Sequence, residues 1–232
     1  SPLMAEKLTL NDHLYFTASD IAPSIYQAPF CMFLNLKLWE DYNFDIDVYE
    51  TVLEGKWTLD VLSGLTKDLD RDLNDDGKML PKDDFFGVGM QSTDEAAVAF
   101  MESADLVMTE LTADKTNLKL ATLSGTDIAD RFEKIQSIAR NIKHEDINDI
   151  INYAFKEDRA LFLQHKLESA GVHLRDMKSD YLILPMPKYS EDEDYISGVS
   201  GWVSSFAAVP ATVDSDFTGF ILEAMARYSN EN

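Results

Sequence analysis

The chain has 232 residues, 45% hydrophobic and 27% charged, which suits a globular protein with a real core and excludes disorder as its main state. Forty-two Asp and Glu oppose 20 Lys and Arg, and the formal charge of -22 makes nucleic acid and anionic membrane surfaces poor partners. This acidic balance favours cations and neutral solutes as ligands. The single cysteine, Cys31, excludes an internal disulfide and a Cys-based zinc site.

The first half of the chain is patterned for short strands and short helices. The expected strands are His13–Thr17, Pro29–Leu34 and Phe85–Met90. The expected helices are Leu36–Tyr42, Asp47–Leu53, a helix after a Thr58 cap, and Asp94–Val107. No apolar run approaches the roughly 20 residues of a membrane span. The opening Ser1-Pro2-Leu3-Met4 lacks a signal-peptide pattern and suggests either a residue left over from expression or a segment taken from a longer protein.

The second half carries the clearest helix signal. Apolar residues recur at spacings of four and three between Ile128 and Ile142, which predicts a helix over Thr126–Lys143, and the same period continues through Glu145–Phe155. Extended segments are expected at Asn117–Ala121, Arg159–Gln164, Tyr181–Leu184 and Trp202–Val209. A last helix from Asp214 is expected to turn Phe217, Ile221, Met225 and Tyr228 inward. This alternation indicates an α/β fold with a small mixed sheet flanked by helices.

An acidic stretch beginning at Asp72 resembles an EF-hand calcium loop. Oxygen-bearing side chains occupy loop positions 1, 3, 5 and 12, and Gly77 stands at position 6, where the sharp turn needs it. The predicted calcium ligands are Asp72, Asn74, Asp76 and Asp83, with the backbone carbonyl of Lys78. The short Asp at position 12 and Leu80 at position 9 depart from the pattern. An acidic turn that holds only water or a lysine therefore stays open as the alternative.

Catalytic patterns are incomplete throughout the chain, so the sequence predicts a protein that is not an enzyme. The run Gly198-Val-Ser-Gly-Trp202 nearly matches a nucleophile elbow, but Trp202 stands where the second glycine belongs. None of the four histidines lies in a His-Glu-x-x-His pattern. The spacing of His165, Glu168 and His173 does not put all three on one helical face, which favours surface or lightly packed histidines.

The three tryptophans differ in their surroundings. Trp39 falls on an expected helix and Trp57 precedes the Thr58 cap, so both favour packing against the protein interior. Trp202 follows small residues in a segment that could bend beside a cleft. A flat apolar ring beside hydrogen-bonding groups suits stacking on a sugar, but these residues by themselves favour packing of Trp202 in the core.

Several stretches, in this order along nearly the whole chain, resemble the family 1 extracellular solute-binding proteins. The most specific run is Gly55-Lys-Trp57-Thr58-Leu-Asp60, then Asp72-Leu-Asn74-Asp-Asp76-Gly77, then Asp83-Asp84-Phe-Phe86-Gly87. The other stretches are Met32–Tyr42, Arg159–Phe162, Tyr181–Tyr189 and Val209–Ala211.

The resemblance implies the solute-binding component of an ABC importer, which captures a sugar, oligosaccharide or other small neutral solute in a cleft between two lobes and delivers it to permease subunits. It implies one lobe of a type II periplasmic-binding-protein-like fold over residues 1–232, mainly the second lobe, with about 198–232 crossing towards the first. That crossing would place Trp202 near the cleft, so we expect its ring to stack on a sugar, with Ser200 and Tyr26 nearby, and core packing as the alternative. It also implies an extracytoplasmic protein, lipid-anchored at the cell surface in its full length. A carbohydrate-active enzyme module and a calcium-dependent interaction module stay as alternatives.

Overall fold

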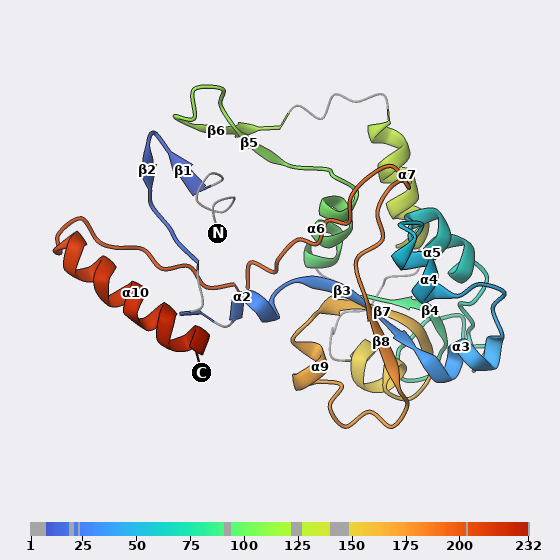
Figure 1. Ribbon diagram of the computed structural model, residues 1–232. Helices are drawn as coiled ribbons and strands as arrows, with labels where there is room; N and C mark the ends of the chain where they lie inside the picture. The colour runs from blue at the N-terminus through green and yellow to red at the C-terminus, as the bar shows by residue number, and fades with distance from the viewer. Residues whose placement is uncertain are drawn as a thin grey trace. The chain divides into compact units, whose positions relative to one another are not determined.

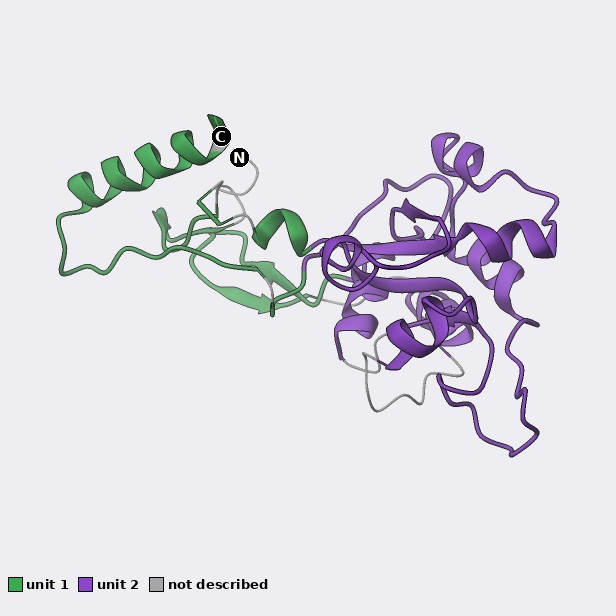
Figure 2. Ribbon diagram, turned by 90° about the horizontal axis from the view of Figure 1, so that it is seen from below, with its two compact units in different colours: residues 1–28, 107–122, 200–232 green, residues 29–106, 123–199 purple. Residues whose placement is uncertain are grey.

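The computed structural model describes residues 8–18, 21–22, 24–90, 94–121, 127–139, 149–202 and 204–231. The chain divides into two compact units (Figure 2). Unit 1 comprises residues 1–28, 107–122 and 200–232, and unit 2 comprises residues 29–106 and 123–199. The organisation of 1–232 as one lobe, with a crossing from about residue 198, stays a prediction.

Unit 2 is built around a four-stranded mixed sheet in the order β4-β7-β3-β8 (Figure 1). These strands are β4 (Phe86–Gly89), β7 (Ala160–Lys166), β3 (Phe30–Asn35) and β8 (Tyr181–Leu184). β3 runs antiparallel to both of its neighbours, whereas β4 and β7 are parallel. Because all six residues of β3 are buried, this strand reads as a continuous apolar run rather than an alternating one.

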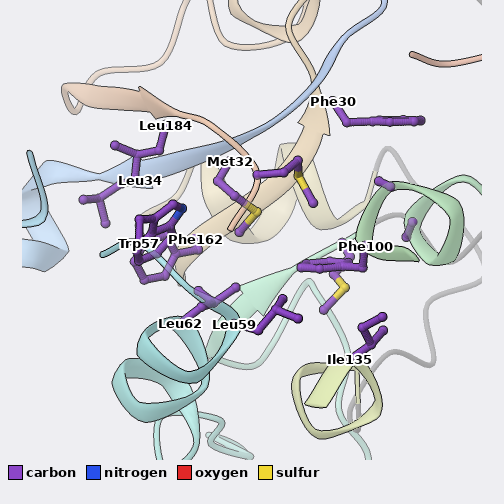
Figure 3. Packing of buried hydrophobic residues seen from close by; sticks show 14 of the residues in the cluster. Phe30, Met32, Leu34, Trp57, Leu59, Leu62, Phe100, Ile135, Phe162 and Leu184 are labelled. Carbon is purple, nitrogen blue, oxygen red and sulfur yellow. The ribbon is translucent and has the colours of Figure 1, made fainter. Parts of the chain in front are cut away.

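The two faces of this sheet carry separate apolar clusters, because successive side chains of a strand point to opposite sides. Phe30, Met32 and Leu34 belong to the larger cluster (Figure 3), which includes residues of α5 (Leu59–Thr66), α6 (Asp94–Ser103) and α7 (Ile128–Ile138). Cys31 and Phe33 belong to the other, with residues of the π-helix η1 (Ile150–Phe155). A short helix, α9 (Ser169–Val172), follows β7. The mixed sheet flanked by helices confirms the predicted fold class.

Trp57 is a core residue of unit 2, as its sequence context indicated. It is fully buried and packs against Phe162, with 5.6 Å between ring centroids (Figure 3). Its indole N–H donates to the carbonyl of Pro185 at 3.0 Å, so burial leaves no polar atom of the ring unpaired. Trp39 packs against the same cluster.

Side-chain caps explain why the first three helices of unit 2 begin where the sequence predicted. Asn35 caps α3 (Leu36–Tyr42) by accepting from the amide of Leu38. Asp47 caps α4 (Val48–Leu53), and Thr58 caps α5 by accepting from Val61. Each cap satisfies amide groups that the first helical turn leaves without a partner. Such signals are local in sequence, so they could be predicted without tertiary information.

Several of the expected helices differ from the prediction. α6 ends at Ser103 rather than Val107, and Asp105 adopts a left-handed φ of 52° that a helix cannot continue through. α7 ends at Ile138 with Ala139 as its C-cap, rather than continuing unbroken to Lys143, and residues 140–148 lie outside the described residues. The described part of the Glu145–Phe155 helix is η1, a π-helix rather than an α-helix.

Unit 1 contains small, separate elements (Figure 1). Strands β1 (Thr9–Leu10) and β2 (His13–Leu14) form one antiparallel pair, and β5 (Thr109–Leu111) and β6 (Leu118–Leu120) form another. The helices are α2 (Ser24–Gln27) and α10 (Ser215–Glu231). The strand expected at Trp202–Val209 is wrong, because pairing in the described part of that stretch is limited to one bridge between Ala207 and Thr17. The other described residues of this stretch form no strand pairing.

The expected inward face of α10 is also wrong. Phe217, Ile221, Met225 and Tyr228 do fall on one side of the helix, but they are 64%, 40%, 50% and 72% exposed. Helical periodicity shows that residues share a face, and it does not supply an element to cover that face. Among the described residues, no helix combines the length and the apolar character needed to cross a membrane.

Candidate functional site

The segment Ser200–Trp202 in unit 1 presents an aromatic ring to solvent. Ser200 is fully buried, and its amide donates to the carbonyl of Ala28 at 3.0 Å. The hydroxyl of Ser200 accepts from the amide of Trp202 at 3.3 Å, which fixes a tight turn. Trp202 is 87% exposed, so its ring is not part of a core. Ser200 thus shapes the turn and Trp202 offers a flat apolar face.

Tyr26 lies on the neighbouring segment of the same unit. It belongs to α2 and is 59% exposed. The residue that follows this helix, Ala28, provides the carbonyl that Ser200 binds, and the amide of Ala28 donates to Ser24 at 2.9 Å. The three predicted solute contacts therefore lie on two segments that share a backbone hydrogen bond. Their role in binding stays a prediction.

The predicted calcium loop in unit 2 is a closed turn. Arg71 and Phe85 form an antiparallel bridge at its base, with N···O distances of 2.9 and 3.0 Å. Inside the loop, side-chain oxygens accept from the loop's own amides. Asp72 accepts from Gly77 at 2.8 Å, Asn74 from Asp76 at 3.1 Å, and Asp76 from Lys78 at 2.8 Å. Gly77 has a φ of 76°, which explains glycine at this position.

Sequence reasoning missed the carboxylate that organises this loop. Asp84 is fully buried and accepts from the amides of Leu73 and Leu80 at 2.9 and 2.6 Å, whereas Asp83 is exposed. Two adjacent aspartates were visible in the sequence, but only the fold decides which of them turns inward. No group of three or more His, Cys, Asp or Glu side chains in the described chain is arranged to hold a metal ion. Calcium binding by this loop stays a prediction.

His165 corrects the interpretation of the histidines as surface or lightly packed residues. It lies on β7 and is 1% exposed, because this central strand is covered on both faces. Its Nδ1 pairs with the hydroxyl of Ser169. Burial, and then the charges of Lys166 and His173, lower the pKa of His165 from 6.5 to about 3. The buried ring is therefore neutral, and its burial argues against a catalytic role on an external substrate.

Unit 1 also contains two cavities. One, of about 740 Å³, is lined by the β5–β6 pair and its connecting loop, including Val107, Leu111 and Leu118. The other, of about 440 Å³, lies between Ile21 and α10, where Ile221, Met225 and Tyr228 line it. Trp202 lines neither cavity, so the predicted solute contacts and these cavities are distinct features of unit 1.

Comparison with solved structures identifies the fold. Over 98% of its length, the chain matches the maltose/maltodextrin-binding domain MalE from Bdellovibrio bacteriovorus bound to maltotriose, with a TM-score of 0.53 and 20% identity. The fold is that of the sugar-type extracellular solute-binding proteins. The solute-binding protein RafE in complex with raffinose matches 96% of the chain, with a TM-score of 0.53 and 14% identity. A family 1 extracellular solute-binding protein from Bifidobacterium longum subsp. infantis matches 87%, with a TM-score of 0.50 and 12% identity.

The chain spans about half the length of these solute-binding proteins, namely 51%, 54% and 49% of the three solved chains. No protein-family model and no curated protein sequence matches the chain. The likeness therefore establishes the fold, in agreement with the resemblance seen in the sequence. The solute, the importer and the residues that bind belong to a proposal.

Proposed function

We propose that this protein is the extracytoplasmic solute-binding component of an ABC importer, that it captures a sugar or oligosaccharide, and that it is not an enzyme. The observation that carries the proposal is the exposed ring of Trp202 on a chain with the fold of sugar-binding proteins. A rigid aromatic face with hydrogen-bonding groups beside it suits a sugar ring. We further propose permease subunits as partners and a lipid anchor in the full-length protein.

Within this proposal, Trp202 stacks on the solute while Ser200 and Tyr26 shape its surroundings. The buried hydroxyl of Ser200 already accepts from Trp202, so its main contribution is to hold the turn that presents the ring. The exposed ring of Tyr26 provides a second aromatic surface. The acidic composition does not oppose a neutral ligand, because an uncharged sugar feels no net Coulomb force.

Replacement of Trp202 by alanine tests the proposal. Calorimetric titration with maltotriose and with raffinose should show that Trp202→Ala weakens binding by about 1 kcal/mol, roughly fivefold, while the melting temperature stays nearly unchanged. Phe206→Ala is the matched control, because Phe206 is a half-exposed aromatic residue of the same segment without a proposed role. Unchanged sugar affinity in Trp202→Ala, or release of cleaved sugar during the titration, would contradict the proposed function.

We also propose that Asp72, Asn74, Asp76, Asp83 and the carbonyl of Lys78 bind one structural calcium ion. The closed base of the loop and the turn at Gly77 support this assignment, because they hold the oxygen-bearing residues in one short loop. Calcium should raise the melting temperature, and a chelator should reverse the rise. Asp76→Asn should reduce the effect, whereas Asp114→Asn, in the β5–β6 connection of unit 1, should not. A melting temperature that stays the same when calcium is added would refute the site.

A further inference from the structure

Glu102 has a carboxyl oxygen that no described residue pairs with by a hydrogen bond. It lies in the last turn of α6, next to the buried residues Phe100 and Ser103. Its Oε2 is buried and has no hydrogen-bond partner within the part of the chain that the structure describes. An unpaired buried oxygen of this kind costs free energy, and more when the carboxyl group is ionised. The position of this oxygen therefore requires an explanation.

The carboxyl group of Glu102 lies directly against Gly198. It occupies the space that a side chain at position 198 would fill, so any Cβ there would overlap Oε2. The φ of Gly198 is not in the left-handed region, so glycine is needed here for space rather than for backbone conformation. A glycine Cα–H is a weak donor, which makes a poor partner for a full negative charge.

Gly198 is also the point at which the chain is attached to the start of β3. The amide of Phe30 donates to the carbonyl of Gly198 at 2.9 Å, and Pro29 and Val199 form an antiparallel bridge. Val199 and then Ser200 follow, and Ser200 opens the segment that carries Trp202. Glu102 thus contacts a residue one position before the end of unit 2.

Few charges surround this contact. At the other end of α6, Glu95 pairs with Lys166 at 3.7 Å. Seven residues of helix, about 10 Å, separate Glu95 from Glu102. Lys166 of β7 is the register partner of Phe30 on β3, and Phe30 in turn binds Gly198. The β3 strand therefore lies between Lys166 and Gly198. Burial raises the pKa of Glu102, and no charged group among the described residues adds to the shift.

We propose that Glu102 is a positioning residue whose protonated carboxyl group seats Gly198 against Phe30, and whose ionisation loosens that attachment. A neutral carboxyl group tolerates the glycine CH₂ and the apolar surroundings, whereas a carboxylate loses hydration there without gaining a partner. Because the folded-state pKa is raised, the contact is most stable below the unfolded pKa of Glu and weakens as pH rises through the folded pKa. The consequence for sugar capture rests on the proposed function, and the seating of Gly198 does not.

Hydrogen exchange at the Phe30 amide tests the proposal in the complete chain. Glu102→Gln keeps the shape and removes the charge. At pH 4, the variant and the original protein should protect this amide equally. At pH 7.5, the variant should protect it more, by up to about tenfold for each pH unit by which the folded pKa of Glu102 exceeds its pKa in the unfolded chain. Equal ratios at both pH values, or weaker protection in the variant at pH 7.5, would overturn the proposal.

A double-substitution cycle tests the contact without relying on pH. Gly198→Ala should lower protection of the Phe30 amide in the original protein, and Glu102→Ala should abolish most of that loss by vacating the space. Gly201→Ala is the matched control, because nothing lies within 4 Å of a Cβ at that position. An equal loss from Gly198→Ala with and without the Glu102 side chain would overturn the contact.

These measurements use no solute, so they separate the two ideas. Normal sugar binding by Trp202→Ala would defeat the proposed function and leave the Glu102 results standing. Exchange at Phe30 that does not respond to Glu102 would defeat the positioning role and leave sugar binding untouched. If both hold, the sugar affinity of Glu102→Gln should depend less on pH than that of the original protein between pH 4 and 7.5.

Discussion

Units 1 and 2 differ in how far their apolar residues are buried. Unit 2 buries a two-faced sheet and its helices, whereas Ala18, Ala28 and Ser200 are the buried residues among those described in unit 1. Unit 1 is also less charged, with nine acidic and four basic residues in its 77, against 33 and 16 in the 155 of unit 2. Hydrophobic residues therefore become a core only where other elements cover them, and in unit 1 many of them form surface.

Matched phenylalanine substitutions should separate the units most strongly. Phe162 of β7 is fully buried, whereas Phe220 of α10 is 69% exposed. Phe162→Ala should lower the free energy of unfolding by about 3–5 kcal/mol, because it removes buried surface and leaves a cavity. Phe220→Ala should change it by less than about 0.5 kcal/mol. Denaturant unfolding followed by tryptophan fluorescence would measure both, and similar losses would break the contrast.

Acid should destabilise unit 2 through His165. The unfolded chain binds a proton near pH 6.5, whereas burial holds the pKa of folded His165 at about 3. The unfolded state therefore gains protons first as pH falls, and stability should drop by about 1.4 kcal/mol per pH unit between these values. His165→Gln should flatten this slope in unfolding curves recorded from pH 7 to pH 4.

The control for this prediction is His13→Gln, because His13 lies at an exposed position of β2 in unit 1. This control should leave the dependence of stability on pH unchanged. An unchanged slope in His165→Gln would show that other groups account for the acid sensitivity. A flattened slope in His13→Gln would show that unit 1 contributes to it.

Arginine–glutamate ion pairs should differ between the units by a smaller amount. Arg131 pairs with Glu193 at 2.5 Å, with side chains 13% and 25% exposed, and its guanidinium lies 3.9 Å from the ring centroid of Tyr189. Arg227 pairs with Glu223 on α10, with side chains 75% and 62% exposed. Glu193→Gln should cost about 1 kcal/mol and Glu223→Gln under about 0.5 kcal/mol. Equal costs in thermal unfolding would contradict the role of burial.

Local chemistry let the sequence determine much of unit 2. Thr58, Asp47 and Asn35 start helices because their side chains accept hydrogen bonds from nearby amides. The apolar run Pro29–Leu34 predicted β3 because a short, continuous apolar segment is typical of a buried strand. The resemblance in the sequence also pointed to the fold that the solved structures share. Each of these signals lies within a few residues or in the order of short motifs.

Only the tertiary structure decided which side chains are covered. It turned Asp84 inward instead of Asp83, buried His165 in a central strand, and left the apolar face of α10 exposed. It also placed Glu102 on Gly198, a contact between residues 96 positions apart. Periodicity specifies a face of a helix or strand, but burial depends on elements that arrive from distant parts of the chain. The sequence by itself therefore determined most of the elements of unit 2 and the fold class, and the packing decided the environment of each functional group.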